Sequence, residues 1–269
     1  MCLILMSYEQ HPVYQLIFAA NRDEFYDRPT RPLSFWEDRP DIIAGRDMKS
    51  NGTWMGITRT GRFAAVTNYR DTAINIPGAP SRGLLVSEFL SGSDTAETYL
   101  NGIASVGHHY DGFNLLVGDR SGLWYYSNKA NGIQKLTPGI FGISNHLLNT
   151  PWPKVKKGKA DLQNLLEVSK VMRHEDLLKI LEDNSVAPDE SLPQTGVDIE
   201  WERILSPLFI SSSMYGTRSS TALLMKRNGR VIFVERTFIP RENGATKQET
   251  RKFSFRLLPA DYTYHFPKN

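Results

Sequence analysis

The sequence predicts an α+β fold in which antiparallel sheets are covered by helices. Apolar, strand-like runs come in pairs separated by short turns, and helical periodicity is confined to residues 81–107 and 154–184. Strands and helices do not alternate one by one, as a doubly wound parallel sheet requires. Because no internal repeat or long break in composition divides the chain, we expect one domain over residues 1–269.

Turn signals locate the strand pairs. Residues 2–8 are apolar up to a polar turn, and "VYQLIFAANR" follows as the partner strand. Two further strands flank Thr60-Gly61, while "FNLLVGDRSGLWYYSN" and "GIQKLTPGIFGISN" each predict a strand, a turn and a strand. Asn228-Gly229 lies between two apolar runs and is the strongest hairpin signal, because Asn-Gly tolerates the positive φ angles of a type I′ turn.

Each helical stretch contains two segments. In residues 81–107, Asp94 and Glu97 resemble a capping box at the start of the second segment. The stretch 154–184 begins with a basic run that we interpret as the solvated face of a helix start: Lys154, Lys156, Lys157 and Lys159. The Pro-rich, acidic stretch 186–200 predicts a loop.

Composition excludes several classes of function. Hydrophobic residues make up 40% and charged residues 23% of the chain, which suffices for a sizeable core. The formal net charge is +3 and no basic stripe is interleaved with aromatic residues, so we expect no nucleic-acid partner. No stretch approaches the ~18 apolar residues that a membrane span needs, and the start lacks a secretory signal, so we expect a cytoplasmic protein.

The only cysteine, Cys2, directly follows the initiator methionine. One cysteine excludes an intrachain disulfide and a cysteine-rich zinc site, and we expect no bound metal. Since cysteine is small, we expect methionine aminopeptidase to remove Met1 and leave a thiol and a free α-amine on one residue. Such an amine has an unperturbed pKa of about 7.7–8.0 and can serve as the base of the nucleophile. The alternative is a small buried residue at a strand start.

Four polar residues, Asn21 to Glu24, close the second predicted strand. If this strand pairs with the one that begins at Cys2, the guanidinium of Arg22 can face the thiol and lower its pKa. Within a strand, Arg22 and Glu24 share one face and Asp23 takes the other. The alternative is a strand end that enters solvent.

Asn68 and Asn145 each end an apolar strand. Asparagine at such a position is most often a turn former, and the functional alternative is an amide aimed at a developing oxyanion. Arg218, in "YGTRSST", is either a residue of a surface loop or a second cation near the site.

Several motifs together resemble the NRDE-motif family, the family of the transport and Golgi organisation protein. They follow one another in the expected order over most of the chain: "MC", "AANRDEFYDRP", "NGTWMGI", "AAVTNYR", "GFNLLVGD", "GISNHLLNTPWPKV" and "YGTRSSTALL". That family looks like a branch of the N-terminal nucleophile (Ntn) hydrolases, near penicillin V acylase and bile salt hydrolase. The resemblance implies a four-layer αββα sandwich of two antiparallel sheets with helices outside.

The resemblance also implies roles for the residues around the terminus. Cys2 would be the nucleophile once Met1 is removed, and Arg22 would sit against its thiol. In the acylases an aspartate follows the arginine by three residues, whereas this chain has Phe25 there. The acid that holds the α-amine is therefore left open between Asp23 and Glu24.

Further along the chain, the resemblance assigns the polar residues at the strand ends. Asn68 matches the oxyanion asparagine, Asn145 the asparagine that holds the amine or substrate, and Arg218 the distal arginine. We expect three further residues to bind substrate: Glu24, Tyr69 and His146.

Two functions follow from the resemblance. The first is an Ntn-type cysteine amidohydrolase or thioesterase that acts on a small acyl compound without a cofactor. The second is non-catalytic binding or trafficking of haem or an acyl lipid in the same cleft, with the thiolate of Cys2 as a haem ligand.

Overall fold

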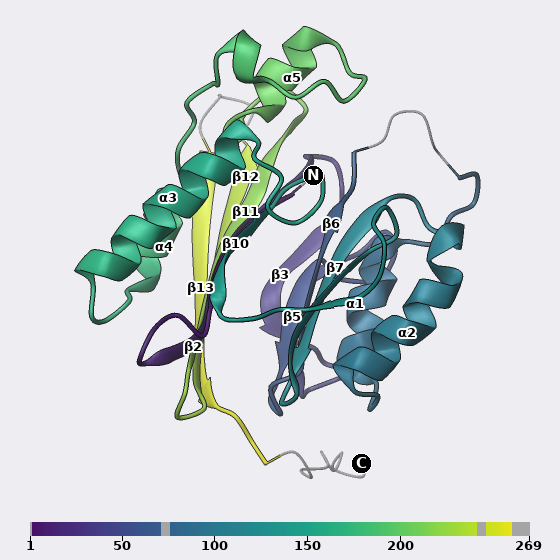
Figure 1. Cartoon of the computed structure of the whole chain (residues 1–269), viewed down its shortest axis with the longest axis vertical. Helices are drawn as coiled ribbons and strands as arrows, with labels where there is room; N and C mark the ends of the chain where they lie inside the picture. The colour runs from purple at the N-terminus through teal and green to yellow at the C-terminus, as the bar shows by residue number, and fades with distance from the viewer. Residues whose placement is uncertain (1, 71–75, 241–245, 260–269) are drawn as a thin grey trace.

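Two antiparallel sheets face each other in this computed structural model, which describes residues 2–70, 76–240 and 246–259 (Figure 1). Sheet A has, in spatial order, β10 (Gly139–Ile143), β1 (Cys2–Tyr8), β2 (Tyr14–Phe25), β11 (Tyr215–Lys226), β12 (Arg230–Pro240) and β13 (Thr246–Arg256). Sheet B follows chain order: β3 (Thr30–Phe35), β4 (Ile42–Asp47), β5 (Met55–Thr58), β6 (Phe63–Asn68), β7 (Phe113–Asp119), β8 (Gly122–Ser127) and β9 (Gln134–Lys135).

Helices cover the outer face of each sheet. Helices α1 (Arg82–Ser91) and α2 (Ala96–Val106) pack on sheet B, while α3 (Pro153–Val168) and α4 (His174–Ile180) pack on sheet A. Helix α5 (Ile199–Leu205) lies at the end of the sandwich where the chain begins, and two short 3-10 helices are η1 (Gly107–His109) and η2 (Asp189–Ser191). The predicted α+β fold and its αββα layer order are confirmed. None of the helices in the described ranges is long and apolar enough to cross a membrane.

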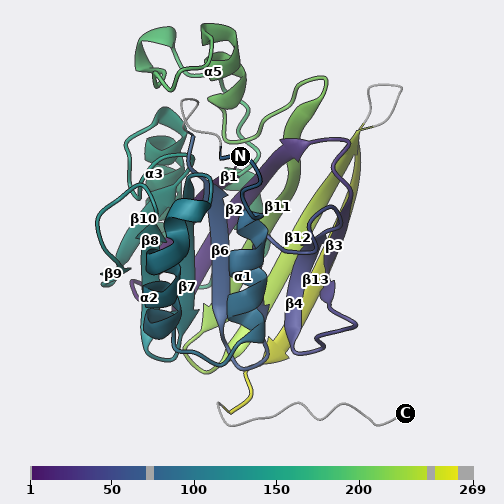
Figure 2. The same ribbon diagram turned by 90° about the vertical axis from the view of Figure 1, so that its right-hand side faces the viewer.

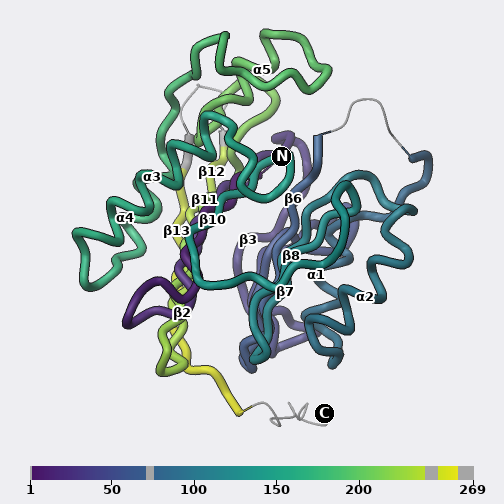
Figure 3. Tube along the Cα trace, in the orientation of Figure 1, coloured from purple at the N-terminus to yellow at the C-terminus, as the bar shows by residue number. Residues whose placement is uncertain are grey.

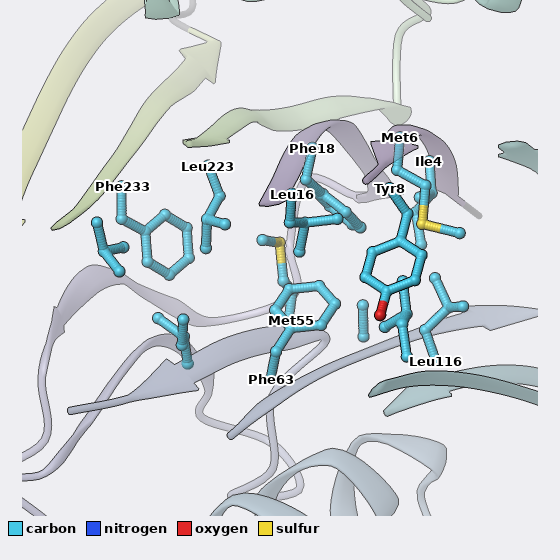
Figure 4. Close-up of a cluster of buried hydrophobic side chains, with 14 of the residues drawn as sticks. Ile4, Met6, Tyr8, Leu16, Phe18, Met55, Phe63, Leu116, Leu223 and Phe233 are labelled. Carbon is cyan, nitrogen blue, oxygen red and sulfur yellow. The ribbon is translucent and has the colours of Figure 1, made fainter. Parts of the chain in front are cut away.

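The main core lies between the two sheets, as Figure 4 shows. Ile4 and Met6 of β1 and Phe18 of β2 meet Phe63 of sheet B there, because alternate residues of a strand point to the same face. Leu3 and Leu5 point the other way and pack under α3 and α4. Each fully buried side chain of this kind stabilises the fold by about 1.5–3 kcal/mol, so the register of β1 is strongly specified.

The first strand is held on both sides. Residues 4–8 pair with residues 139–143 of β10, and residues 2–8 pair with residues 16–22 of β2. Figures 2 and 3 show β1 in sheet A, where it lies between β2 and β10, and β10 is more than a hundred residues away in sequence. Cys2 is therefore placed by a ladder of backbone hydrogen bonds rather than left on a frayed end.

Most predicted hairpins are confirmed, and one is not. The pairs β1–β2, β5–β6, β7–β8 and β11–β12 form as the turn signals indicate. In "GIQKLTPGIFGISN", however, β9 pairs with β8 in sheet B while β10 pairs with β1 in sheet A. The turn between them carries the chain from one sheet to the other, which a pattern of apolar runs does not distinguish from a hairpin.

Local details also differ from the predictions. The β11–β12 turn has positive φ at Gly229 but not at Asn228, so its three-residue loop is not a type I′ turn. The side chain that caps α2 belongs to Thr95, which accepts from the Thr98 amide, and not to Asp94. Lys154 is 3% exposed, so the interpretation of this lysine as solvated was wrong.

Candidate active site

Cys2 and Arg22 lie directly opposite each other on β1 and β2. Opposite residues of an antiparallel pair share a face, so both side chains project toward sheet B. This confirms the prediction that Arg22 lies beside Cys2. The guanidinium carbon of Arg22 lies 4.2 Å from the ring centre of Trp54, and Nη1 donates to Thr30 Oγ1 at 3.3 Å. Stacking on Trp54 thus fixes the cation that faces the thiol.

A cavity of about 110 Å³ opens beside the thiol, and we refer to it as the cysteine cavity. Its wall combines the ends of β1 and β2 with residues of sheet B and the start of α1: Cys2, Arg22, Asp23, Glu24, Arg28, Asp47, Thr53, Trp54, Val66, Asn68, Ser81, Arg82 and Gly83. Four of the predicted catalytic residues therefore share one cavity, whose wall is drawn from three different layers of the fold.

Two opposing effects act on the thiol. Burial and the negative charge of Asp23 raise the pKa of Cys2, while the charge of Arg22 and the backbone N–H of Asp23 lower it. Since burial is the larger effect, the thiol stays protonated near neutral pH. A thiol in this environment needs a base before it can act as a nucleophile.

Asp23 and Lys154 are both buried and interact electrostatically, and Asp23 lines the cysteine cavity. The Asp23 carboxylate accepts a hydrogen bond from Thr217 at 2.7 Å, and Lys154 Nζ donates to the Leu205 carbonyl at 2.8 Å. Burial raises the pKa of Asp23, and the charge of Lys154 opposes that rise. Burial also lowers the pKa of Lys154 to about 8, against the opposing effect of Asp23.

Glu24 lines the cysteine cavity but is engaged by its neighbours. One carboxylate oxygen accepts from the Phe25 amide at 2.9 Å, and the other lies 3.8 Å from Arg28 Nε. Arg28 also donates to Asp47 from Nε at 3.1 Å and from Nη2 at 2.5 Å. The positive charge of Arg28 is thereby shared between two carboxylates.

The two predicted asparagines, Asn68 and Asn145, are joined by a hydrogen bond, but only Asn68 lines the cysteine cavity. Asn68 ends β6 and lines the cysteine cavity, whereas Asn145 lies fully buried behind it. Asn145 Nδ2 donates to the Asn68 carbonyl at 2.9 Å, and Ser144 Oγ donates to the Cys2 carbonyl at 3.2 Å. Asn145 therefore holds the backbone of Asn68 in place, and it is Asn68 that faces the thiol's cavity.

A buried ion pair fastens α5 to the same strand end. Arg70 Nη1 lies 2.7 Å from Glu202, and the two side chains are 7% and 4% exposed. The backbone amide of Arg70 donates to the Asn145 carbonyl at 2.7 Å, and Thr195 also donates to Glu202. The segment before and within α5 is thus joined to the loop that follows Asn68.

Arg218 lies outside the cysteine cavity, in a larger one next to it. This adjoining cavity has a volume of about 570 Å³ and shares Arg22, Arg28 and Trp54 with the first. Arg218 donates to the carbonyls of Phe25 and Arg28 at 2.7 and 3.1 Å. It therefore braces the turn after β2 and lines the larger space.

The side chains of Tyr69 and His146 are hydrogen-bonded to each other. The Tyr69 hydroxyl lies 2.8 Å from His146 Nε2, and His146 Nδ1 lies 2.8 Å from Thr150 Oγ1. Neither side chain lines the cysteine cavity or the adjoining cavity. Their predicted contact with substrate stays a prediction.

Sequence reasoning missed several residues of the cavity wall, notably Trp54, Asp47 and Arg82. Trp54 lies in the motif "NGTWMGI", and Arg82 lies in "GAPSRG", but neither pattern indicates proximity to Cys2. Their positions follow from how sheet B and α1 pack against the end of sheet A.

Comparison with known proteins identifies the family. The profile of the family described as Transport and Golgi organisation 2 matches residues 1–240. The chain belongs to this family. Its homologue in Mus musculus is 35% identical over 277 residues, covering 96% of this chain and 99% of the mouse protein, and the Homo sapiens homologue gives the same values. The Drosophila melanogaster member is 26% identical, with 88% of this chain and 92% of that protein covered. The predicted membership is confirmed.

Two solved structures are also similar to this chain. They are a variant of conjugated bile acid hydrolase from Clostridium perfringens, at 9% identity and TM-score 0.49, and the N-acylethanolamine-hydrolyzing acid amidase orthologue of Caenorhabditis elegans, at 10% and 0.48. The first match covers 99% of this chain and 100% of the hydrolase, and the second covers 83% of this chain and 92% of the amidase. Among the described residues, no group of three or more His, Cys, Asp or Glu side chains is arranged to hold a metal ion.

Proposed function

We propose that this chain is an Ntn-type cysteine hydrolase that cleaves the amide or thioester bond of a small acyl compound through Cys2 after removal of Met1. The observation that carries the proposal is the position of the lone thiol, opposite Arg22 and in one cavity with Asn68. A half-buried thiol with a raised pKa requires a base, and the α-amine of a mature N-terminal cysteine supplies one on the same residue.

The reaction begins when the α-amine takes the thiol proton and the sulfur attacks the carbonyl carbon. A carbon–sulfur bond forms, and the carbonyl electron pair moves to oxygen, where the Asn68 amide donates a hydrogen bond. Collapse of this intermediate breaks the bond to the leaving group, which takes the proton from the α-ammonium. Water then attacks the acyl-enzyme while the amine takes one of its protons, the carbon–sulfur bond breaks, the acid leaves, and the proton returns from the α-ammonium to the sulfur.

Between the two candidate acids, we assign the holding of the α-amine to Asp23. Glu24 is engaged by the Phe25 amide and by Arg28, which leaves it less suited to a second cation. Asp23 directly follows Arg22 and lines the cysteine cavity, and although burial raises its pKa, the charge of Lys154 opposes that rise.

A second candidate function is the binding or trafficking of haem or an acyl lipid without turnover. The adjoining cavity favours it, since about 570 Å³ falls within the roughly 300–1,000 Å³ of small-molecule sites. In this alternative, Arg22 and Arg28, which line both cavities, orient a ligand that is carried rather than cleaved.

The test is acylation of Cys2. Protein whose first residue has been established by intact mass is incubated with a library of short N-acyl amides and acyl thioesters. We expect an acyl adduct on the wild-type chain, hydrolysis of at least one compound, and neither in Cys2→Ala. The melting temperature should change little in that variant, because removal of one small thiol loses limited burial.

Two outcomes contradict the proposal. Turnover that persists in Cys2→Ala would assign the activity to another group. Absence of adduct and turnover in a chain that begins at Cys2, together with tight binding that Cys2→Ala leaves unchanged, would favour the carrier function.

A further inference from the structure

A second arginine faces the cysteine cavity from the opposite layer of the fold. Arg82 is the first residue of α1, on the outer side of sheet B, and it lines the cavity together with Ser81 and Gly83. Its Nη1 donates to the Gly112 carbonyl at 3.1 Å, which anchors one edge of the guanidinium. Arg22 lines the same cavity from sheet A. The cavity beside the thiol therefore has a guanidinium group on each of two facing layers, and its wall also includes Arg28 and three carboxylates: Asp23, Glu24 and Asp47.

In the described part of the chain, no carboxylate oxygen lies within 4.0 Å of the guanidinium nitrogens of Arg22 or Arg82, so opposing charges act only at longer range: Asp111 on Arg82, and Asp47 and Glu235 on Arg22. The acids on the cavity wall are used elsewhere, since Asp47 and Glu24 contact Arg28 and Asp23 accepts from Thr217. Arg22 is only 7% exposed. A cation buried to this degree is costly unless an anion compensates it.

The end of α1 adds to the positive potential. Helix N-termini favour negative charge, yet α1 begins with an arginine and has no acidic residue in its first turn. The side chain of Ser81, its N-cap residue, makes no capping hydrogen bond. Helix α2, by contrast, is capped by Thr95 and carries Glu97 in its first turn. The α1 terminus and Arg82 thus repel each other unless an anion lies between them.

We propose that Ser81, Arg82 and the N-terminal end of α1 form, with Arg22, an anion subsite in the cysteine cavity. It follows, on the basis of the proposed function, that the compound attacked by Cys2 carries a carboxylate or phosphate group close to its scissile carbonyl. The cavity of about 110 Å³ that holds the subsite also contains Cys2 and Asn68, which sets the short separation between the anion and the reacting carbon.

Alkylation of Cys2 tests the subsite without requiring turnover. Iodoacetate and iodoacetamide form the same sulfur–carbon bond and release iodide. Iodoacetate carries a negatively charged carboxylate, whereas iodoacetamide carries a neutral amide. We expect the ratio of the iodoacetate rate to the iodoacetamide rate to be about tenfold higher for Cys2 than for a free thiol, because two guanidinium groups bind the carboxylate.

Substitution of Arg82 should remove this preference. Arg82→Gln is expected to bring the ratio down to that of the free thiol, while Arg82→Lys keeps part of it. Arg173→Gln is the matched control, since Arg173 is an exposed arginine that also stands at a helix start, that of α4, and does not line the cavity. An equal ratio in the wild-type chain and in Arg82→Gln would overturn the proposal.

A second measurement uses only the wild-type protein, so it tests the subsite even if an Arg82 variant folds poorly. It also distinguishes a carboxylate from a phosphate as the bound anion. At constant ionic strength, inorganic phosphate or acetate should slow the reaction of wild-type Cys2 with iodoacetamide and raise the melting temperature, since a ligand that binds the folded state stabilises it. Protection by phosphate alone indicates a phosphate ester, and protection by acetate alone indicates a carboxylate. Protection by neither overturns the subsite. A subsite that passes these tests in a protein without hydrolysis would refute only the proposed function.

Discussion

Breaking the buried pair between Arg70 and Glu202 should destabilise the protein strongly. Glu202→Gln keeps the shape of the side chain and its capacity to accept from Thr195, but it removes the charge that compensates Arg70. Both side chains are more than nine-tenths buried and the closest N–O distance is 2.7 Å. Removing one partner of such a pair costs about 3–5 kcal/mol, because the remaining charge stays buried.

This loss converts to a measurable shift in melting temperature. For a chain of this size, 1 kcal/mol corresponds to about 2 °C, so we expect the melting temperature to fall by about 6–10 °C. Differential scanning calorimetry on the purified protein, with urea unfolding as a second probe, measures the change. Because Arg70 also donates to the Asn145 carbonyl, the loop behind Asn68 should lose protection from hydrogen exchange in the same variant.

A neighbouring pair supplies the control. Arg203, which follows Glu202 in sequence, donates hydrogen bonds from two guanidinium nitrogens to the Asp189 carboxylate. Both of these side chains are about half exposed. Asp189→Asn should leave the melting temperature almost unchanged, since exposed pairs contribute little. If Glu202→Gln and Asp189→Asn shift the melting temperature equally, burial does not govern the strength of the pair and the reasoning fails.

Three further outcomes are expected. Native protein should lack Met1 in intact-mass spectra, and a native chain that retains it would argue against an Ntn mechanism. Burial lowers the pKa of Lys154 to about 8, so between pH 8 and about 10.4 the unfolded chain binds more protons than the folded one, and the free energy of unfolding should rise with pH. Urea unfolding over this range should show the wild-type free energy of unfolding rising by up to about 3 kcal/mol relative to that of Lys154→Met. Parallel pH curves for the two proteins would contradict this prediction. Gly45→Ala places a methyl group against the Trp54 ring, closer than van der Waals contact, and should lower the free energy of unfolding by about 1–3 kcal/mol in thermal unfolding. Gly102→Ala in α2 has open space for the methyl group and should stabilise the protein slightly. The reverse order of stabilities would refute the packing argument.

The sequence was most informative where strands are apolar on one or both faces. The register of β1 and β2 follows from their apolar residues, and it brings Cys2 opposite Arg22. The separate strands β3, β4 and β13 were not predicted. In the edge strand β13 the first seven residues are polar or charged and only Phe253 and Phe255 are apolar, so few side chains signal burial.

The remaining parts of the site depend on packing between layers. Arg82 and Trp54 reach the cysteine cavity because sheet B and α1 approach the end of sheet A, and no local pattern encodes that approach. Lys154 looks solvated among its neighbouring lysines, and only the position of α3 over sheet A buries it. Four hairpins could thus be predicted from short-range patterns, whereas the opposite wall of the cavity could not.

The topology of sheet A has a consequence for the synthesis of the protein. All strands of sheet B lie between residues 30 and 135, so this sheet can pair in chain order as the polypeptide grows. The hairpin of β1 and β2 must wait for β11, which begins at Tyr215, roughly 190 residues later and about 10–40 s at the usual speed of translation. Until β11 is made, the edge of β2 that pairs with it stays open, and this is the period when a chaperone is most needed. Every residue of the cysteine-cavity wall lies between Cys2 and Gly83, yet β2, which carries Arg22, gains its second neighbouring strand only when β11 is made.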